Sequence, residues 1–563
     1  MDDSRTHQGF GGMWNKNAWV CAFVFLITFV FWAPSSRNGF TYDDRPAAMG
    51  KHENGINHSV QEEKSLGHYF STNYWDSFST KSTLFRPITV LSYAFRHRFF
   101  GDNPLPAHLL NILLASFGAI LVFLLLKLLN LGNAASAVGA IVFSTHALHS
   151  EVIANVVGRA ELLGFTFGLS ACLIIIHARK TSGIKAGLLR LCSSALFFLA
   201  FCSKENALNW LPFLPLLGFC FHQKAKTEQS LGHRIPQSSG WRTLVSPLHD
   251  PRFFFDSLAA ILPAIIFFYL RGRMISQLPS GPDLTINWTA NPLYFVSTSS
   301  RILTALLFQG WGLLQTIAPF WLSADYGPHI SPLVPELSSP TGIAALLVGF
   351  LLFLLICLGI SQWRRRPVVF LSVGTFFGFS FLTSNLAFPI GTIYGERLMF
   401  APSLGWAIFL GFIGSRIRSN TRTTFVLMLG LWLGASGITA IKRQKIWKDN
   451  QSLFLHEAAA HPESIKMQLC AGQEWLLRND FEKAFIFFRD GVALDPRNPS
   501  AWNLLGVSLL NLGRGAEAEK AFLRALKGRK RDLLLHRSAI LKNLRMIREK
   551  KRQKSGRNAK APR

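Results

Sequence analysis

The chain has 563 residues, of which 49% are hydrophobic and 16% charged, and its formal net charge is +28. This composition is too apolar for a water-soluble globular protein and indicates a membrane protein with several spans. Nearly half of the excess positive charge lies at the end of the chain, where residues 527–563 contain fifteen Lys or Arg against Asp532 and Glu549.

Membrane-spanning helices are the first elements that the sequence predicts. A span needs about 20 mostly apolar residues. Eleven apolar runs approach that length, and they are 18–34, 108–129, 134–147, 161–178, 187–202, 207–222, 254–271, 339–360, 368–388, 397–415 and 422–441. We interpret a further apolar stretch, 301–318, as a re-entrant or interfacial segment. The sequence therefore predicts an all-α protein in which residues 18–442 form a multi-span helical domain.

Positively charged loops predict the orientation of these helices. Short loops rich in Lys and Arg tend to stay in the cytoplasm, and four such segments are 177–190, 222–252, 364–366 and 416–418. This orientation places the N-terminal residues 1–17 in the cytoplasm. It places loop 35–105 and everything after Lys442 in the lumen.

Three Asn-x-Ser/Thr sequons agree with this orientation. They begin at Asn57, Asn287 and Asn450, and all three fall on the side assigned to the lumen. N-glycosylation takes place in that compartment. We therefore regard these three asparagines as glycosylation candidates.

Two adjacent carboxylates, Asp43 and Asp44, follow the first apolar run. An ionisable pair at a membrane boundary is costly unless it is paired or functional, so it marks a candidate site. A carboxylate within reach of a hydroxyl group can take its proton as a general base. The alternative is that the two acids cap a helix that begins at Arg45-Pro46, because Asp is a favoured N-cap residue.

Further charged residues lie at the predicted luminal edges of the spans. Arg and Lys bind phosphate oxygens, and the cations in such positions are Arg86, Arg159, Lys204 and Arg397. The alternative for each is a side chain that snorkels at the end of a span. The accompanying acids and one histidine are candidates for contact with a donor or an acceptor: His149, Glu151, Glu161, Glu205, Asp325 and Glu396.

Metal and disulfide chemistry have little support in the sequence. Six of the seven cysteines lie in apolar runs, and Cys470 has no second cysteine near it in the C-terminal region. Neither a disulfide framework nor a Cys/His metal motif is present in this pattern. Asp43, Asp44 and Glu151 are oxygen ligands of the kind that a hard cation takes, but we expect no metal and no cofactor.

Helical repeats are predicted in the last quarter of the chain. Gly472 recurs as Gly506 and Ala484 as Ala518, each 34 residues later. This period is typical of tetratricopeptide (TPR) repeats, in which paired helices approach at small residues. We expect region 443–531 to hold a linker helix and two repeats, at 465–498 and 499–532, that form a luminal α-solenoid.

The region 533–563 is predicted to form a helix followed by a basic tail. A basic tail often binds nucleic acid, but the predicted orientation places this one in the lumen, and no nucleic acid partner is expected. The partners that remain for this tail are acidic acceptor surfaces and lipid headgroups. The alternative is a solvated tail that binds no partner.

These motifs together resemble the transmembrane and TPR repeat-containing (TMTC) family. The resemblance covers most of the chain and rests on the segments Tyr42-Asp43-Asp44, Phe85-Arg86-Pro87-Ile88-Thr89, Asn103-Pro104, His108-Leu109-Leu110-Asn111, His146 through Glu151, Val157 through Leu163, Ser203-Lys204-Glu205, Ser323-Ala324-Asp325-Tyr326 and Gly395-Glu396-Arg397-Leu398.

The resemblance implies an O-mannosyltransferase of the GT-C fold in the endoplasmic reticulum membrane. Its implied donor is lipid-linked dolichyl-phosphate mannose, and its implied acceptors are Ser/Thr hydroxyls of luminal proteins with cadherin-like domains. In related enzymes the first acid of the luminal pair is the base, which favours Asp43 over Asp44. Inversion from a β-linked donor to an α-linked product needs one base and no covalent intermediate.

A non-catalytic membrane adaptor, whose repeats bind client proteins, is the alternative function. An adaptor needs only one span and no Arg/Glu pairs beside the bilayer, which is why the enzyme is favoured. A transporter would show inverted repeats or broken helices at mid-membrane, and the apolar pattern has neither.

Overall fold

The computed structural model describes residues 10–52, 55–76, 82–230, 251–279, 286–328, 330 and 333–558. Parts of three sequence-based assignments lie outside these residues: the start of the N-terminal segment 1–17, most of the basic segment 222–252 and the last residues of the tail. A single short hairpin joins β1 (Lys51–His52) to the antiparallel strand β2 (Gly55–Ile56) in the described chain.

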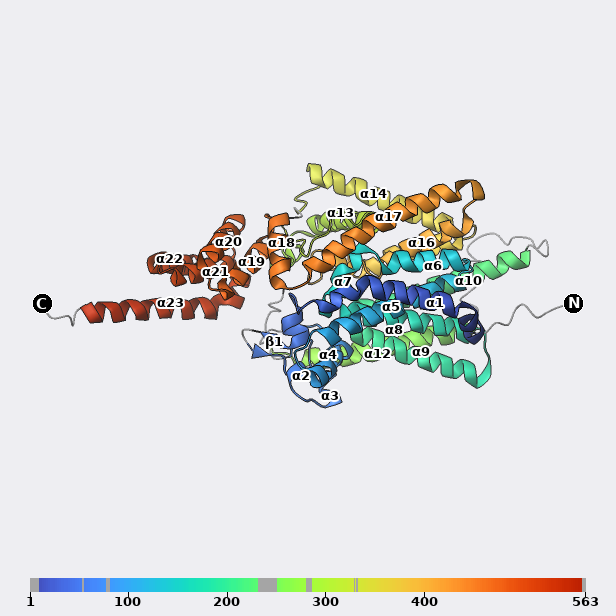
Figure 1. The fold of residues 1–563 in the computed structure, drawn as a ribbon, viewed down its shortest axis with the longest axis horizontal. Helices are drawn as coiled ribbons and strands as arrows, with labels where there is room; N and C mark the ends of the chain where they lie inside the picture. Colours follow the sequence, from blue (N-terminus) through green and yellow to red (C-terminus); the bar gives the residue numbers. More distant parts are fainter. Residues whose placement is uncertain are drawn as a thin grey trace.

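All other regular structure in these residues is helical (Figure 1). In the membrane domain the α-helices are α1 (Phe10–Trp32), α2 (His58–Gln61), α3 (Leu66–Tyr69), α4 (Pro87–Phe100), α5 (Leu105–Leu128), α6 (Asn133–Ser144), α7 (Ser150–Ala154), α8 (Arg159–Ala178), α9 (Gly183–Ser203), α10 (Trp210–Ser230), α12 (Pro251–Ser276), α13 (Thr298–Ile317), α14 (Pro340–Ser361), α15 (Pro367–Phe381), α16 (Ser403–Arg416) and α17 (Ser419–Ile446). The C-terminal helices are α18 (Asn450–Ala460), α19 (Ile465–Leu477), α20 (Phe481–Leu494), α21 (Pro499–Asn511), α22 (Gly515–Ala525) and α23 (Lys530–Asn558).

Short 3-10 and π-helical turns connect several of these helices. They are η1 (Ala33–Arg37), η2 (Arg45–Met49), η3 (Ala147–His149), η4 (Val156–Gly158), η5 (Glu205–Asn209), η7 (Pro292–Tyr294) and η8 (Glu396–Met399). Most of the predicted site residues lie in or beside these turns.

Seven helical segments within the described residues are long and apolar enough to cross a membrane, and they lie at Asn17–Arg37, Leu105–Leu128, Val156–Ala178, Gly183–Ser203, Arg252–Ser276, Pro340–Ser361 and Ser419–Ile446. A bent helix pair, Asn133–Ser144 with Ala147–Ala154, makes an eighth if it counts as one span. The chain is therefore a multi-pass membrane protein, and the helical fold class is confirmed.

The expected number of eleven spans is higher than the structure supports by length and composition. The runs 368–388 and 397–415 form α15 and α16, which have 15 and 14 residues. At 1.5 Å per residue these helices are about 22 Å long, which is less than the hydrocarbon core of a bilayer. The shortening has a clear cause, because the segment between Phe381 and Ser403 folds into turns that hold charged residues of the candidate site.

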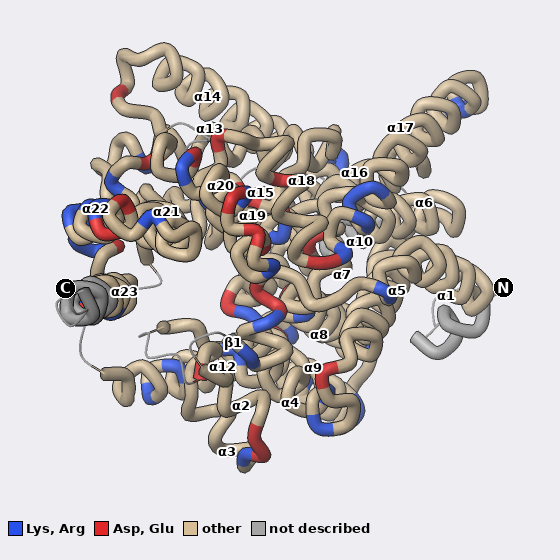
Figure 2. Tube along the Cα trace, turned by 60° about the vertical axis from the view of Figure 1, so that its left-hand side comes forward, with Lys and Arg blue, Asp and Glu red and all other residues tan. Residues whose placement is uncertain are grey.

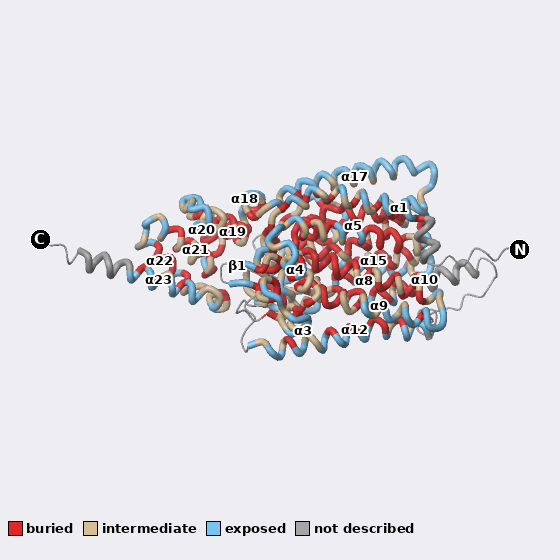
Figure 3. The backbone as a smooth tube through the Cα atoms, turned by 60° about the horizontal axis from the view of Figure 1, so that its bottom comes forward, coloured by how far each residue is buried: buried red, intermediate tan, exposed pale blue. Residues whose placement is uncertain are grey.

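Burial separates the helices at the centre of the membrane domain from those around it. In α5 the side chains from Leu121 to Leu126 are all at most 5% exposed, and α8 is similarly buried. By contrast, α12 and α17 run along the outside with long exposed stretches (Figure 3). Exposed apolar faces of this kind face lipid in a membrane protein. The helix α14 is drawn tan along its length in Figure 2, because it contains no Lys, Arg, Asp or Glu.

The segment 301–318 forms the greater part of α13, a continuous helix of 20 residues. It packs against α14 through small residues, since a Cβ on Gly310 would meet Val348 and one on Gly349 would meet Leu306. Because the helix has no break, a re-entrant shape does not describe it. The interfacial interpretation of 301–318 stays a prediction.

Two helix pairs follow the membrane domain at the period that the sequence predicts. In α19–α20 the backbone of Gly472 packs on the ring of Phe488, and in α21–α22 Gly506 packs on Phe522 in the same way. The apolar face of α23, including Ile540, closes this stack. Figure 1 shows these helices in red at the end of the molecule opposite the N-terminus.

Candidate active site

The Asp44 side chain is fully buried and satisfied by backbone groups. Its Oδ2 accepts hydrogen bonds from the N–H groups of Thr41 and Val156, both at 3.1 Å. Its Oδ1 accepts one from Val157 N–H at 2.8 Å. Asp44 does not cap the turn η2 that follows it, although such a cap was the alternative for the acid pair. It instead joins the segment after α1 to the start of η4.

The Asp43 side chain differs from its neighbour, because it is half-buried and its carboxylate has no hydrogen-bond or ion-pair partner among the described residues. Two cations lie close enough to interact with it electrostatically. These are Arg397 in η8 and Lys466 in α19, and Asp43 raises the pKa of both. Of the two acids, Asp43 is thus the one whose carboxylate is not occupied by backbone donors.

The backbone just before Asp43 is held in an uncommon conformation. Tyr42 has φ +54°, in the left-handed region that costs a non-glycine residue about 1 kcal/mol. Its N–H donates to Asn450 Oδ1 at 2.7 Å, and its ring packs edge-on against Phe454 and under the Lys466 ammonium, 4.8 Å from the ring centre. Helices α18 and α19 therefore fix the position of Asp43.

Three ion pairs lie in this part of the membrane domain, and Arg397 of the first pair interacts electrostatically with Asp43. Arg397 Nη1 donates to Glu151 Oε1 at 2.5 Å, and the Arg397 N–H donates to Oε2 of the same residue at 2.9 Å. Lys204 pairs with Glu161, which also accepts from Asn206. The third pair joins Arg86 Nε, directly before α4, to Glu205 Oε2 in η5 at 2.8 Å.

The cations of these three pairs, Arg397, Lys204 and Arg86, interact electrostatically through Lys204. Burial lowers the pKa of Lys204, and the charges of Arg86 and Arg397 lower it further while Glu161 opposes them. The charge of Glu151 raises the pKa of Arg397. The side chain of Arg397 is 30% exposed, the highest value of the three cations. Arg397 is therefore the cation of the group that a ligand can reach most easily.

At two positions, charged neighbours in the sequence are not ion-pair partners in the structure. Arg159, two residues before Glu161, is fully buried and donates to Asn111 Oδ1 and to the Ala107 carbonyl. Glu396, directly before Arg397, forms its ion pair with Arg443, at 3.4 Å. Residues one or two positions apart on a helical turn point in different directions, so neighbours in the sequence do not become partners.

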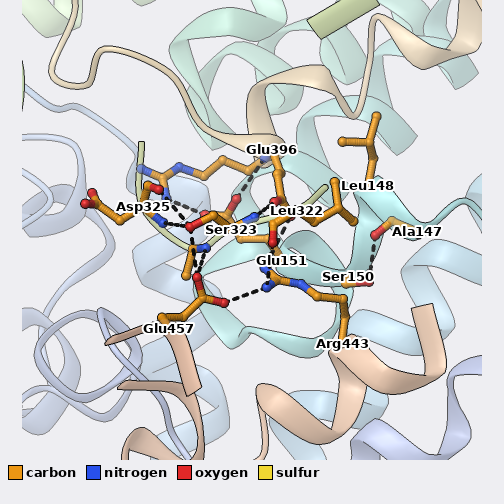
Figure 4. A network of polar contacts seen from close by, with 12 residues as sticks. Ala147, Leu148, Ser150, Glu151, Leu322, Ser323, Asp325, Glu396, Arg443 and Glu457 are labelled. Carbon is orange, nitrogen blue, oxygen red and sulfur yellow. Dashed lines mark hydrogen bonds and ion pairs between the residues drawn. The ribbon is translucent and has the colours of Figure 1, made fainter. Parts of the chain in front are cut away.

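A buried polar network joins the membrane domain to the C-terminal helices (Figure 4). Arg443, near the end of α17, donates to Glu457 Oε1 at 2.6 Å as well as to Glu396. Glu457 Oε2 accepts from the Ser323 hydroxyl at 2.8 Å and from the Ala324 N–H at 2.9 Å. Glu396 and Glu457 thus share one guanidinium in the interface that holds α18 in place.

Asp325 lies at the edge of this network, on the side of the C-terminal helices. Its Oδ2 accepts a hydrogen bond of 2.7 Å from the hydroxyl of Ser464, which also caps α19. Its charge contributes to the raised pKa of Lys466, where burial acts in the opposite direction. Asp325 therefore supports the helix that carries Lys466, and Lys466 faces Asp43.

His149 lies away from the charged groups. Its Nε2 contacts Ser403 Oγ at 2.9 Å, and its ring packs between Phe143 and Phe400. The side chain is fully buried. The structure therefore shows the packed histidine of a core and not a residue that lines the Asp43 site.

Two of the three glycosylation candidates are structural residues. Asn57 is fully buried and donates to the Tyr74 carbonyl at 3.2 Å. Asn450 is 8% exposed and accepts from Tyr42, as described above. A glycan on either would displace these contacts, so both assignments are corrected. Asn287 is half-buried and remains a candidate.

Sequence reasoning missed four residues that build the site: Tyr42, Arg443, Glu457 and Lys466. Two of the four carried a signal, since Tyr42 belongs to the motif Tyr42-Asp43-Asp44 and Arg443 is a cation at the end of an apolar run. Within the described part of the chain, no group of three His, Cys, Asp or Glu side chains is placed to hold a metal ion. The arrangement offers one free carboxylate beside cations, which suits proton removal next to an anionic leaving group.

Comparison with known proteins agrees with the resemblance drawn from the motifs. Human protein O-mannosyl-transferase TMTC4 is 25% identical over 485 residues, covering 81% of this chain and 63% of that protein. Human protein O-mannosyl-transferase TMTC3 is 24% identical over 528 residues, covering 90% and 54%. Protein O-mannosyl-transferase Tmtc3 of Drosophila melanogaster is 24% identical over 572 residues, covering 91% and 58%.

The chain spans little more than half the length of these relatives. They confirm the resemblance to the TMTC family, although no family model matches the chain. The crystal structure of ArnT from Cupriavidus metallidurans bound to undecaprenyl phosphate covers 90% of this chain and 80% of its own, at 11% identity and a TM-score of 0.37. A score of this size does not establish a common fold.

Proposed function

We propose that this relative of the protein O-mannosyl-transferases transfers mannose from dolichyl-phosphate mannose to Ser or Thr hydroxyls of proteins. The single observation that carries the proposal is the contrast between the two acids. Asp44 is occupied by three backbone donors, whereas Asp43 is free of partners and lies beside Arg397 and Lys466.

In the proposed reaction Asp43 is the general base. Its carboxylate takes the hydroxyl proton while the acceptor oxygen attacks the anomeric carbon of mannose, and the bond from that carbon to the phosphate oxygen breaks. The proton moves to Asp43 and the electron pair leaves with dolichyl phosphate. One displacement with inversion needs no second nucleophile, which fits a site with one free carboxylate.

Negative charge develops on the phosphate as it leaves, and the cations near Asp43 stabilise it. Arg397 is assigned this role first, because its side chain is the most exposed of the cation group and Glu151 holds it in place. Lys204 and Arg86 add positive charge behind it. Glu161 and Glu205 orient these two cations and are positioning residues.

The proposed compartment is the lumen of the endoplasmic reticulum. The names of the relatives support a protein acceptor, and the loop that carries Asp43 contacts the C-terminal helices through Tyr42, Asn450 and Lys466. Acceptor proteins reaching Asp43 would then pass beside α18 and α19. Cadherin-like domains are the acceptor class that the family resemblance favours.

The proposal is tested with the purified full chain in liposomes that contain labelled dolichyl-phosphate mannose and an unfolded or cadherin-like protein acceptor. We expect the label on the acceptor in a linkage that β-elimination releases, as for mannose on Ser or Thr. No label is expected when GDP-mannose replaces the lipid-linked donor. Absence of transfer to every acceptor, together with stable client binding by α19–α23, would favour the adaptor function instead.

A further inference from the structure

A basic cavity lies at the end of the membrane domain opposite Asp43. It has a volume of about 1140 Å³ and is lined by the loop between α5 and α6, the loop between α14 and α15, and the end of α16. Its distance from Asp43 follows from α16, which begins a few residues after Arg397 and runs for 14 residues to Arg416. The cavity is thus separate from the candidate active site.

Four arginines line this cavity: Arg365, Arg366, Arg416 and Arg418. None of them has an acidic partner among the described residues. The sequence explains the lack of partners, because 103–150, 337–395 and 397–448 contain no Asp or Glu. Like charges held together without a counter-ion repel one another, and a bound anion relieves that repulsion.

The rest of the lining is apolar or backbone. Leu131, Val368, Phe412, Ile413 and Ile417 contribute apolar side chains. The first turn of α6 also lines the cavity, and no side chain caps it, so its N–H groups add to the positive potential that the arginines create. Such a mixture fits a molecule that is anionic at one end and apolar next to it.

We infer that this cavity binds the phosphate headgroup of an anionic membrane lipid, on the face that we assign to the cytoplasm. Guanidinium groups match phosphate oxygens with paired hydrogen bonds. Basic pockets between spanning helices on that side of a membrane hold such headgroups, and the apolar lining is suited to the first carbons of the acyl chains. Free inorganic phosphate would use the arginines but gain nothing from the apolar side chains.

The first experiment measures binding to the purified full chain in neutral detergent. The probes are dioctanoyl phosphatidic acid, dioctanoyl phosphatidylcholine and inorganic phosphate, titrated at one ionic strength and followed by microscale thermophoresis. We expect phosphatidic acid to bind at least about tenfold more tightly than either of the others. Equal binding of phosphatidylcholine would overturn anion recognition. Equal binding of inorganic phosphate would overturn the assignment to a lipid.

The second experiment locates the site with matched variants. Arg366→Gln with Arg416→Gln removes two positive charges from the cavity, and we expect phosphatidic acid binding to weaken at least about tenfold. Lys180→Gln with Lys185→Gln removes two charges outside the cavity, from exposed side chains just after α8 and in the first turn of α9. This control is expected to bind within about twofold of the unchanged protein.

The inference fails if the lysine control loses as much affinity as the arginine variant, since the effect would then be that of a charged surface. If the double arginine variant does not purify as a single species, Arg365→Gln replaces it, because that single change removes one charge from the same cavity. The lipid selectivity of the unchanged protein is measured independently of any variant.

Discussion

Two neighbouring aspartates have different environments because their side chains leave the backbone in different directions. Asp44 is directed into the protein, where three N–H groups converge on it. Asp43 stays at the boundary between the membrane domain and α19, in a loop that Asn450 and Lys466 hold through Tyr42. A residue that binds backbone donors contributes to stability, and a residue without a partner is available for chemistry.

Asp44→Asn is expected to destabilise the protein. The amide turns an N–H₂ group toward the backbone N–H donors, and a buried donor left without an acceptor costs about 1–3 kcal/mol. We predict a thermal unfolding midpoint several degrees lower than that of the unchanged protein, measured by intrinsic fluorescence in detergent. The matched control is Asp43→Asn, whose midpoint should stay the same, and an equal loss in both variants would contradict the structural role of Asp44.

Glu396 is expected to make stability depend on pH. Burial raises its pKa to about 8, from an ordinary value of 4.5, with Arg443 opposing the shift and Glu151 adding to it. Between pH 4.5 and 8 the folded protein keeps a proton that the unfolded chain releases, so stability falls as the pH rises through this window. We predict a lower unfolding midpoint at pH 8 than at pH 6.

Glu396→Gln should remove this part of the pH dependence, because the amide carries no charge at either pH. The control is Glu457→Gln in the same network. Burial raises the pKa of Glu457, but Arg443 and three hydrogen bonds outweigh that effect and hold the pKa below its usual value. Its substitution should therefore destabilise at both pH values. A Glu396→Gln variant with the same pH dependence as the unchanged protein would contradict a network in which Glu396 and Glu457 share the Arg443 guanidinium.

At the scale of elements, the C-terminal helix pairs depend on two glycines in equivalent positions. A Cβ on Gly472 would lie 2.5 Å from the Phe488 ring, and one on Gly506 would lie 2.6 Å from the Phe522 ring. Both rings are fully buried and have little room to move. The helices of each pair can approach only because these positions have no side chain.

Gly472→Ala is therefore predicted to destabilise the helix pairs by about 1–3 kcal/mol, the usual cost of overpacking a core. The control is Gly515→Ala at the start of α22, where an added Cβ meets no atom within 4 Å. That change should be neutral or slightly stabilising, since alanine favours helix more than glycine does. Amide hydrogen exchange across residues 465–525 would measure the stability of both variants. Equal protection in the two variants would contradict the close approach of α19 and α20.

The same elements show what could be predicted from the sequence. Apolar runs and the 34-residue period are local patterns, and each predicted helices that the structure contains. The ion pairs were not local: Glu151 and Arg397 are 246 positions apart. Nothing in a single sequence indicates which of several acids at the membrane edge will meet a given arginine. The shortened helices α15 and α16 escaped prediction for a related reason, because tertiary contacts of η8 end them early.

At the scale of the whole molecule, the C-terminal helices are part of the candidate active site and not an appendage. The Arg443 network fixes α18 against the membrane domain, Asn450 holds the loop before Asp43, and α19 brings Lys466 towards that carboxylate. The position of the proposed base therefore depends on helices that lie more than 400 residues away in the sequence.

Truncation of the chain separates membrane insertion from mannose transfer. A chain that ends after Lys448 lacks α18 to α23, and we predict that it inserts into membranes but transfers no mannose, because the loop at Tyr42 loses its partners. A chain that ends after Glu549 keeps the buried face of α23 and should transfer at a near-normal rate. Normal transfer by the shorter chain, measured in the liposome assay, would refute the contribution of α18 and α19.

In the proposed reaction Asp43 is the base, and Asp44 is a structural residue. The experiment that separates these roles compares mannose transfer from dolichyl-phosphate mannose by Asp43→Asn and Asp44→Asn, at equal amounts of correctly inserted protein and below the unfolding temperature of either. We predict that Asp43→Asn loses about 10²–10⁴-fold in rate, as expected for a general base, while Asp44→Asn keeps most of the rate per folded molecule. Normal transfer by Asp43→Asn, or a larger loss in Asp44→Asn, would contradict it.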